Sequence, residues 1–196
     1  MEMLTLRSYL DLIGLPDAPL NQGGSLQKQF LKKGCHSYRD AIVYVKKLTY
    51  GRTSDRGNYQ QVLKEKRGTC SGKHALLAAL ARELSIPHQL VLGIFLLDKQ
   101  NMPQIHAILE KYDLPAIPEA HSFLEFSGKT LDVTFPDSQE YDFLVPLEQR
   151  ITILPEAIGE HKVTLHQSFI NQWAKNRDLD ASLVWSAREE WIHSLS

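Results

Sequence analysis

Apolar residues in the middle of the chain recur at helical spacing, directly after a glycine and a cysteine. Residues 75–84 consist mainly of strong helix formers. Their apolar positions form one stripe, as in a helix packed on a hydrophobic core: Leu76, Leu77, Leu80, Ala81 and Leu84. Cys70 stands where this helix is expected to begin. The pattern therefore predicts a central helix with a thiol at its N-terminus.

Similar patterns predict further short elements around this helix. The largely apolar run 88–97 is typical of a buried strand. Residues 17–25 and 50–60 are rich in turn-forming residues and are expected to be loops. Helices are expected over residues 4–13, 37–48 (with Ser37 as N-cap), 60–66, 103–111, 164–175 and 180–195.

A β-hairpin is expected between residues 121 and 135. Its strands are residues 121–126 and 130–135, joined by a turn at Ser127 and Gly128. With Phe126 opposite Lys129, the expected register also pairs Phe123 with Asp132 and His121 with Thr134. Paired residues share a face and faces alternate along a strand, so His121 and Asp132 are diagonal neighbours on one face.

These three positions together suggest nucleophilic chemistry. A thiol at a helix N-terminus experiences the positive end of the helix dipole, which favours the reactive thiolate. A carboxylate beside an imidazole accepts a hydrogen bond from one ring nitrogen and leaves the other for the thiol. Taken alone, Cys70 would also fit an ordinary buried cysteine, and Asp132 a solvated strand carboxylate.

Three segments of the sequence resemble the transglutaminase-like superfamily of papain-related cysteine enzymes. They are residues 68–77 (GTCSGKHALL), 121–125 (HSFLE) and 128–134 (GKTLDVT), and the resemblance extends over about residues 37–136. It implies an α+β fold in which a central helix led by the cysteine packs on an antiparallel β-sheet, with flanking helices. We therefore expect one domain over residues 1–196, with its core at about 37–136 and a helical C-terminal extension at about 156–196.

The resemblance implies a role for each residue of the set. Cys70 would be the nucleophile, His121 the general base and acid, and Asp132 the group that orients the imidazole. Three features depart from the family pattern: Phe123 stands where tryptophan is more usual, the hairpin is shorter than in many members, and the usual tryptophan before the aspartate is absent. These departures do not change the family assignment, but they leave open which subgroup of the family the chain resembles.

Such a set would attack a peptide or protein amide and pass through a thioester. The oxyanion needs preorganised donors. The backbone N–H of Cys70 is the natural first donor, and the candidates for a second are Asn58, Tyr59, Gln60 and Gln61, among which the sequence does not choose. We expect a cysteine hydrolase (protease or amidase). The alternatives are a transglutaminase, in which an amine replaces water, and a non-catalytic binding module that keeps the fold.

Composition excludes several other classes. Twenty-two Lys and Arg balance 23 Asp and Glu, and the net charge of -1 gives no nucleic-acid-binding surface. No apolar run reaches the length of a membrane span, so no membrane partner is expected. The first residues lack a basic leader followed by an apolar core, which favours a cytoplasmic protein.

Cysteine and histidine usage predicts neither disulfides nor metal. Two cysteines are too few for a disulfide framework, and a Cys35–Cys70 bridge, the alternative, would block the nucleophile. The chain has eight histidines but no HExxH or CxxC spacing, and it lacks a phosphate-binding loop. No metal and no cofactor are therefore expected.

Four features keep two interpretations each. His74 shares a helix face with Cys70 and is interpreted as a surface histidine rather than a group that tunes the thiol. Lys73 either favours the thiolate by its charge or is exposed. Glu125 lines the cleft or pairs with a cation. The C-terminal helices either cover the cleft or form a dimer interface, and the oligomeric state stays open.

Overall fold

The computed structural model describes residues 5–136 and 146–195. Its helices are α1 (Leu6–Leu12), α2 (Ser25–Leu31), α3 (Tyr38–Lys46), α4 (Gln61–Glu65), α5 (Cys70–Glu83), α6 (His106–Lys111), α7 (Glu160–Lys175) and α8 (Ala181–Ser194), with short 3-10 helices at η1 (Pro103–Ile105) and η2 (Pro155–Ala157). Its strands are β1 (Thr49–Tyr50), β2 (Arg67–Gly68), β3 (Gln89–Leu97), β4 (Ile117–Phe126), β5 (Lys129–Leu131) and β6 (Gln149–Ile153).

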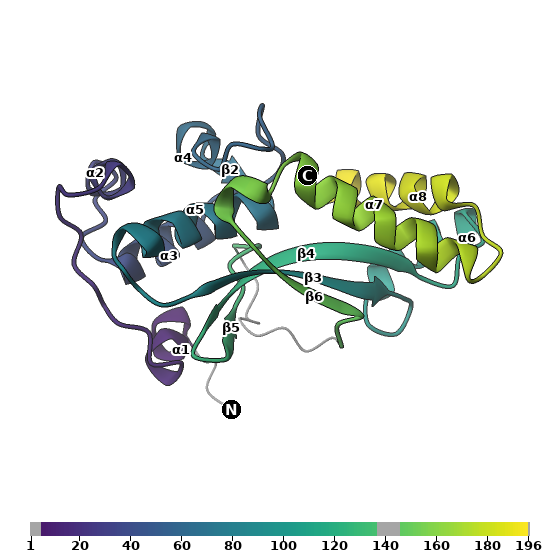
Figure 1. Cartoon of the computed structure of the whole chain (residues 1–196), viewed down its shortest axis with the longest axis horizontal. Helices are drawn as coiled ribbons and strands as arrows, with labels where there is room; N and C mark the ends of the chain where they lie inside the picture. Colours follow the sequence, from purple (N-terminus) through teal and green to yellow (C-terminus); the bar gives the residue numbers. More distant parts are fainter. Residues whose placement is uncertain (1–4, 137–145, 196) are drawn as a thin grey trace.

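Four of the strands form an antiparallel sheet in the order β5-β4-β3-β6, and β1 and β2 form a separate parallel pair. Helix α5 lies over one half of the four-stranded sheet, and α7 and α8 lie over the other half on the same side (Figure 1). The fold is therefore α+β, with the central helix packed on an antiparallel sheet, as expected.

Helix α5 is buried on almost all sides, which a helix tolerates only inside a core. Its N-cap is Thr69, and the chain leaves the helix through Ser85, whose φ is 55°. Every residue from Ala75 to Ala81 is at most 2% exposed. The predicted central helix is thus confirmed, including its start at Cys70.

The buried apolar side chains form two clusters. The first surrounds α5 and takes in α1, α2, α3 and the nearer half of the sheet, with Leu76 and Leu92 among its members. The second lies between α6, α7, α8 and the other half of the sheet and includes Phe95 and Trp173. Cys70 is buried but belongs to neither cluster. The thiol thus lies at the junction of the two apolar clusters.

The hairpin has the predicted register, but its second strand is shorter than expected. Phe126 pairs with Lys129 and Leu124 with Leu131, and pairing ends there. The expected pairs Phe123–Asp132 and His121–Thr134 are therefore wrong. The chain leaves the sheet because the Asp132 carboxylate accepts hydrogen bonds from the N–H and hydroxyl of Thr134, at 2.8 and 2.6 Å, and so forms a local turn.

The elements that the sequence analysis missed depend on contacts with distant parts of the chain. The first turn of α2 is capped by the carboxylate of Glu83, which accepts from the N–H groups of Leu26 and Gln27 at 3.0 and 3.1 Å. Strand β6 is a largely exposed edge strand that pairs only with β3.

The remaining elements follow the prediction with small shifts at their ends. Helix α3 is capped by the side chain of Ser37, as expected. Helix α7 begins at Glu160, four residues earlier than predicted. Helix α1 begins at Leu6, and the predicted start at residue 4 lies outside the described residues. Within the described parts of the chain, no helix is long and apolar enough to cross a membrane.

Candidate active site

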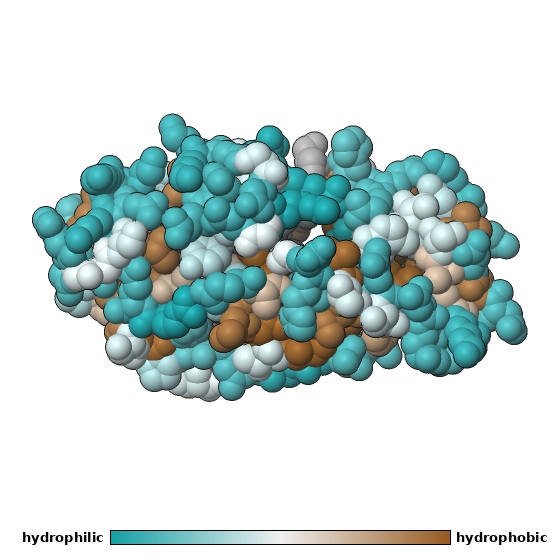
Figure 2. Space-filling view, turned by 45° about the horizontal axis from the view of Figure 1, so that its top comes forward, coloured by the Kyte–Doolittle hydropathy of each residue, from teal (hydrophilic) through white to brown (hydrophobic). Residues whose placement is uncertain are grey.

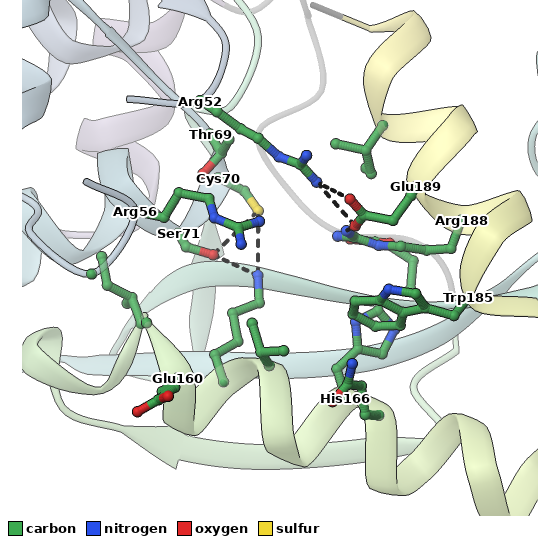
Figure 3. A pocket seen from close by; sticks show the side chains of 18 of the residues that line it. Arg52, Arg56, Thr69, Cys70, Ser71, Glu160, His166, Trp185, Arg188 and Glu189 are labelled. Atoms are coloured by element: carbon green, nitrogen blue, oxygen red, sulfur yellow. Dashed lines mark hydrogen bonds and ion pairs between the residues drawn. The ribbon is translucent and has the colours of Figure 1, made fainter. Parts of the chain in front are cut away.

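Cys70 lies on the wall of a cavity of about 700 Å³ between the start of α5 and the helices α7 and α8. Figure 2 shows a largely hydrophilic face with a hollow near its middle. The cavity wall comes from the loop after β1, from the start of α5 and from α7 and α8, and these parts surround the thiol in Figure 3. The lining residues of the two C-terminal helices are Glu160, Lys162, Val163, His166, Gln167, Trp185, Arg188, Glu189 and Ile192.

His121 and Asp132 form a buried pair beside the thiol. The Nε2–H group of His121 donates to Oδ2 of Asp132 at 2.7 Å, and this leaves Nδ1 for another partner. Although burial opposes a charge, the carboxylate of Asp132 and the sulfur of Cys70 raise the pKa of His121 to about 10. The pKa of Asp132 is held well below its usual range, despite burial, by the charge and hydrogen bond of His121. The sequence analysis expected these two groups to be neighbours, and they are in contact, although Asp132 lies beyond the end of β5 and not in a strand pair.

The thiol of Cys70 is acidified by its surroundings. Burial raises its pKa, but the charges of Lys162 and His121 and hydrogen bonds from the His121 side chain and the Ser122 backbone N–H outweigh this effect. The net result is a pKa of about 6. At neutral pH the pair is therefore thiolate and imidazolium, and the thiolate is the reactive form of a cysteine.

Cys35 gives the opposite case within the same chain. Both cysteines are free and buried. Burial, together with the nearby charge of Asp40, raises the pKa of Cys35 to about 11. Cys35 thus stays a thiol at neutral pH, and the acidity of Cys70 comes from its site and not from burial.

His74 does not lie on the surface, although the sequence analysis expected it there. It is completely buried, and its Nε2 accepts the N–H of Val133 at 2.9 Å while its Nδ1–H donates to the carbonyl of Cys70 at 2.8 Å. Burial lowers its pKa to about 4, so the ring is neutral. His74 therefore ties the first turn of α5 to the segment that carries Asp132.

Lys73 is fully buried and not exposed. Its ammonium donates to the carbonyls of Leu48 and Thr134 at 2.6 and 2.7 Å. Burial is the main reason that its pKa falls to about 8. Lys73 and His74 thus fix the segment around Asp132 from two neighbouring positions of one helix.

Lys162 is a site residue that the sequence analysis missed. Its side chain, 8% exposed, reaches from α7 to donate to the hydroxyl of Ser71 at 2.5 Å and lies 3.9 Å from Sγ of Cys70 (Figure 3). The hydroxyl of Ser71 also lies 3.2 Å from that of Ser122 on β4. No sequence pattern indicated this contact, because it joins residues more than ninety positions apart.

The four candidates for a second oxyanion donor lie outside the cavity lining. The side chain of Asn58 accepts the N–H of Gln60 at 3.0 Å, and Tyr59 packs against the first apolar cluster. Gln61 begins the short helix α4. The preceding loop contributes other residues to the wall: Arg52, Asp55, Arg56 and Gly57.

Two ion pairs hold the far wall of the cavity. Arg188 of α8 donates from two nitrogens to the carboxylate of Glu119 on β4, at 2.7 and 2.8 Å; Glu119 is buried and Arg188 largely so. Arg52, in the loop after β1, pairs with Glu189 at 2.8 Å. Helix α8 is thereby fixed to both the sheet and the loop. Glu125, for which two interpretations were open, pairs with Arg150 of β6.

Replacing Arg188 by leucine is expected to destabilise the fold by about 3–5 kcal/mol, because it leaves Glu119 as an unpaired buried charge. In the wild type the pKa of Glu119 is lowered, so its stabilising contribution is present above the unfolded value of about 4.5 and is lost as the pH falls toward about 2. In the variant, burial raises that pKa against only the weaker effects of His166 and Lys162, and stability is lost as the pH rises through the raised pKa. Urea denaturation at a series of pH values measures both the loss of stability and its pH dependence. An unchanged profile would contradict the assignment, and Glu119→Leu/Arg188→Leu is the matched control.

The described residues contain no group of three or more His, Cys, Asp and Glu side chains placed to hold a metal ion. The buried titratable groups around the thiol are instead engaged with one another or with backbone carbonyls.

Comparison with known families agrees with this arrangement. The family model described as the transglutaminase-like superfamily matches residues 25–126, just over half of the 196 residues. The chain therefore belongs to the transglutaminase-like superfamily, whose members are usually catalytic. The match includes Cys70 and His121 but ends before Asp132 and before the C-terminal helices. No curated protein and no solved structure matched the chain.

Proposed function

We propose that this protein is a cysteine hydrolase that cleaves peptide-like amide bonds through a thioester intermediate. The observation that carries the proposal is the contact of His121 with Asp132 at 2.7 Å beside an acidified thiol on a cavity wall. Cys70 would be the nucleophile, His121 the proton carrier and Asp132 the residue that orients the ring. Family membership supports a catalytic role for the set.

The proposed reaction follows from the charge state of the pair. The Cys70 thiolate attacks the amide carbonyl carbon, a C–S bond forms, and the oxygen takes the negative charge. The backbone N–H of Cys70 is available to this oxyanion, because the first N–H groups of a helix have no intrahelical partner. The C–N bond then breaks, and His121 gives its proton to the leaving amine.

The second half of the reaction uses His121 as a base. The now neutral imidazole takes a proton from water, whose oxygen attacks the thioester carbonyl. Collapse releases the carboxylic acid and returns Cys70 to the thiolate and His121 to the imidazolium. Asp132 stays ionised throughout and holds the ring in one tautomer.

Hydrolysis is favoured over transfer to an amine by the cavity lining. Its charged side chains include Arg52, Asp55, Arg56 and Glu160, which are partly or fully exposed and therefore hydrated. Water thus has access to a thioester on Cys70. Two free thiols, one of them the nucleophile, fit a reducing compartment, and the cytoplasmic location remains part of this proposal.

A p-nitrophenyl ester of a small acid tests the function without knowledge of the natural substrate. In a Cys35→Ser background we expect a burst of one nitrophenolate per chain, with the acyl group on Cys70 by peptide mass mapping, followed by slow hydrolysis. A burst that survives in Cys70→Ala would contradict the assigned nucleophile. Acyl transfer to an added primary amine in preference to water would indicate a transglutaminase, and absence of acylation a binding module.

A further inference from the structure

Lys162 is a buried cation without a carboxylate partner within ion-pair distance among the described residues. Glu119, the buried acid on the neighbouring strand, is engaged by Arg188. Within the same described part of the chain, the Lys162 ammonium has two polar neighbours, the hydroxyl of Ser71 and, at 3.9 Å, the sulfur of Cys70. A buried ammonium is unfavourable unless an anion compensates it. The available anion is the thiolate.

The thiolate has two cations beside it, the His121 imidazolium and the Lys162 ammonium. The other buried cation near the site, Lys73, is held by the carbonyls of Leu48 and Thr134. After attack the negative charge moves from sulfur to the oxyanion. His121 then gives up its proton, whereas the Lys162 ammonium stays beside the reacting atoms.

The position of Lys162 also suits the oxyanion. The oxygen lies on the carbon that is bonded to Sγ, two bonds from the sulfur. An ammonium 3.9 Å from Sγ is therefore within reach of that oxygen after a small side-chain adjustment. None of the four polar residues before α5 that were considered for this task lies on the cavity wall.

We propose that Lys162 is the counter-ion of the Cys70 thiolate and, after attack, a donor to the oxyanion. This inference rests on the proposed function. It assigns to helix α7, outside the region matched by the family model, a charge that the catalytic centre needs. A purely structural Lys162 would only bind α7 to α5 through Ser71.

The test compares Lys162→Met, Lys162→Arg and Ser71→Ala in a Cys35→Ser background. Lys175→Met is the matched control, because Lys175 is an exposed lysine at the other end of the same helix. Two quantities are measured on Cys70: the pH midpoint of its alkylation by iodoacetamide, and the ratio of its alkylation rates with anionic iodoacetate and neutral iodoacetamide. The second quantity reports the charge near sulfur and does not depend on how tightly α7 packs.

We expect Lys162→Met to raise the midpoint by about 1–3 pH units, the effect of an opposite charge within about 6 Å, and to lower the iodoacetate preference. Lys162→Arg and Lys175→Met should leave both quantities near the wild type. Ser71→Ala removes the hydrogen bond but keeps the cation, so its effect should be smaller.

Three outcomes separate this inference from the proposed function. In the first outcome the wild-type midpoint is low, His121→Ala raises it and Lys162→Met leaves it unchanged. This result would overturn the assignment of Lys162 as counter-ion but would retain the triad of Cys70, His121 and Asp132. Equal midpoint shifts in Lys162→Met and Ser71→Ala would also overturn the counter-ion, because Lys162 would then act only through its contact with α5. A wild-type midpoint near the ordinary cysteine value would overturn both proposals.

Discussion

Replacing His121 by alanine is expected to raise the pKa of the Cys70 thiol from about 6 to at least about 8.5, the ordinary value for cysteine. The variant loses the imidazolium charge and its hydrogen bond to sulfur, while burial of the thiol, which opposes the thiolate, remains. Such a change reduces the thiolate population at neutral pH by about 30-fold. Loss of the proton carrier should slow ester and amide cleavage by a further 10²- to 10⁴-fold, roughly.

The thiolate population and the reaction rate should be measured separately for this variant. A more basic thiolate is also more nucleophilic, so alkylation at neutral pH falls less than the thiolate population does. Thiolate absorbance against pH gives the population directly, and the burst rate with the nitrophenyl ester gives the chemistry. His88→Ala, on a partly buried histidine whose ring contacts a backbone carbonyl away from the cavity, is the matched control. An unchanged thiol pKa in His121→Ala would contradict the ion pair.

Replacing Asp132 by asparagine is expected to reduce turnover by up to about 10⁴-fold while leaving the fold intact. The carboxylate is the main favourable charge that keeps His121 protonated, and its loss should bring the pKa of His121 down from about 10. Without the imidazolium the thiolate loses one of its two counter-charges, so the pH midpoint of Cys70 alkylation should rise. An asparagine side chain can still accept from Thr134, which preserves the local turn.

Thr134→Val is the comparison for this variant. It removes the hydroxyl that donates to Asp132 at 2.6 Å but keeps the carboxylate and its contact with His121. We expect a much smaller loss of turnover than for Asp132→Asn. Equal losses in the two variants would mean that Asp132 acts by shaping the turn, which would remove its assigned electrostatic role.

The central helix and the hairpin could be predicted because their signals are local. The apolar stripe of residues 75–84 and the cysteine before it define α5. The turn at Ser127 and Gly128 fixes the register, since a two-residue loop leaves one pairing. The alternation of faces along the strands therefore placed His121 and Asp132 on one side, although Asp132 lies just beyond the end of β5.

The expectation of a surface position was wrong for His74, and for Lys73 in one of its two interpretations, for a physical reason. A polar residue on a helix is ordinarily a surface residue, and the sequence does not show that all sides of α5 are covered. Burial of Lys73 is compensated by the carbonyls of Leu48 and Thr134, and burial of His74 by Val133 and Cys70. These partners come from loops whose paths depend on the complete fold.

The position of Lys162 and the composition of the cavity wall could not be predicted from the sequence for a related reason. Contacts between α7 and α5 are set by tertiary packing, and a single lysine shortly before an expected helix carries no signal. The expectation that the C-terminal helices cover the cleft agrees with their share of the cavity wall. Their second possible role, as a dimer interface, stays a prediction that size-exclusion chromatography can test.

The assigned nucleophile is tested most directly by the pH titration of thiolate absorbance in a Cys35→Ser chain, in which Cys70 is the single remaining cysteine. With the triad assembled as described, the thiolate should form with a midpoint near pH 6. A midpoint at or above about 8.5, the ordinary value for a cysteine, would contradict the assignment.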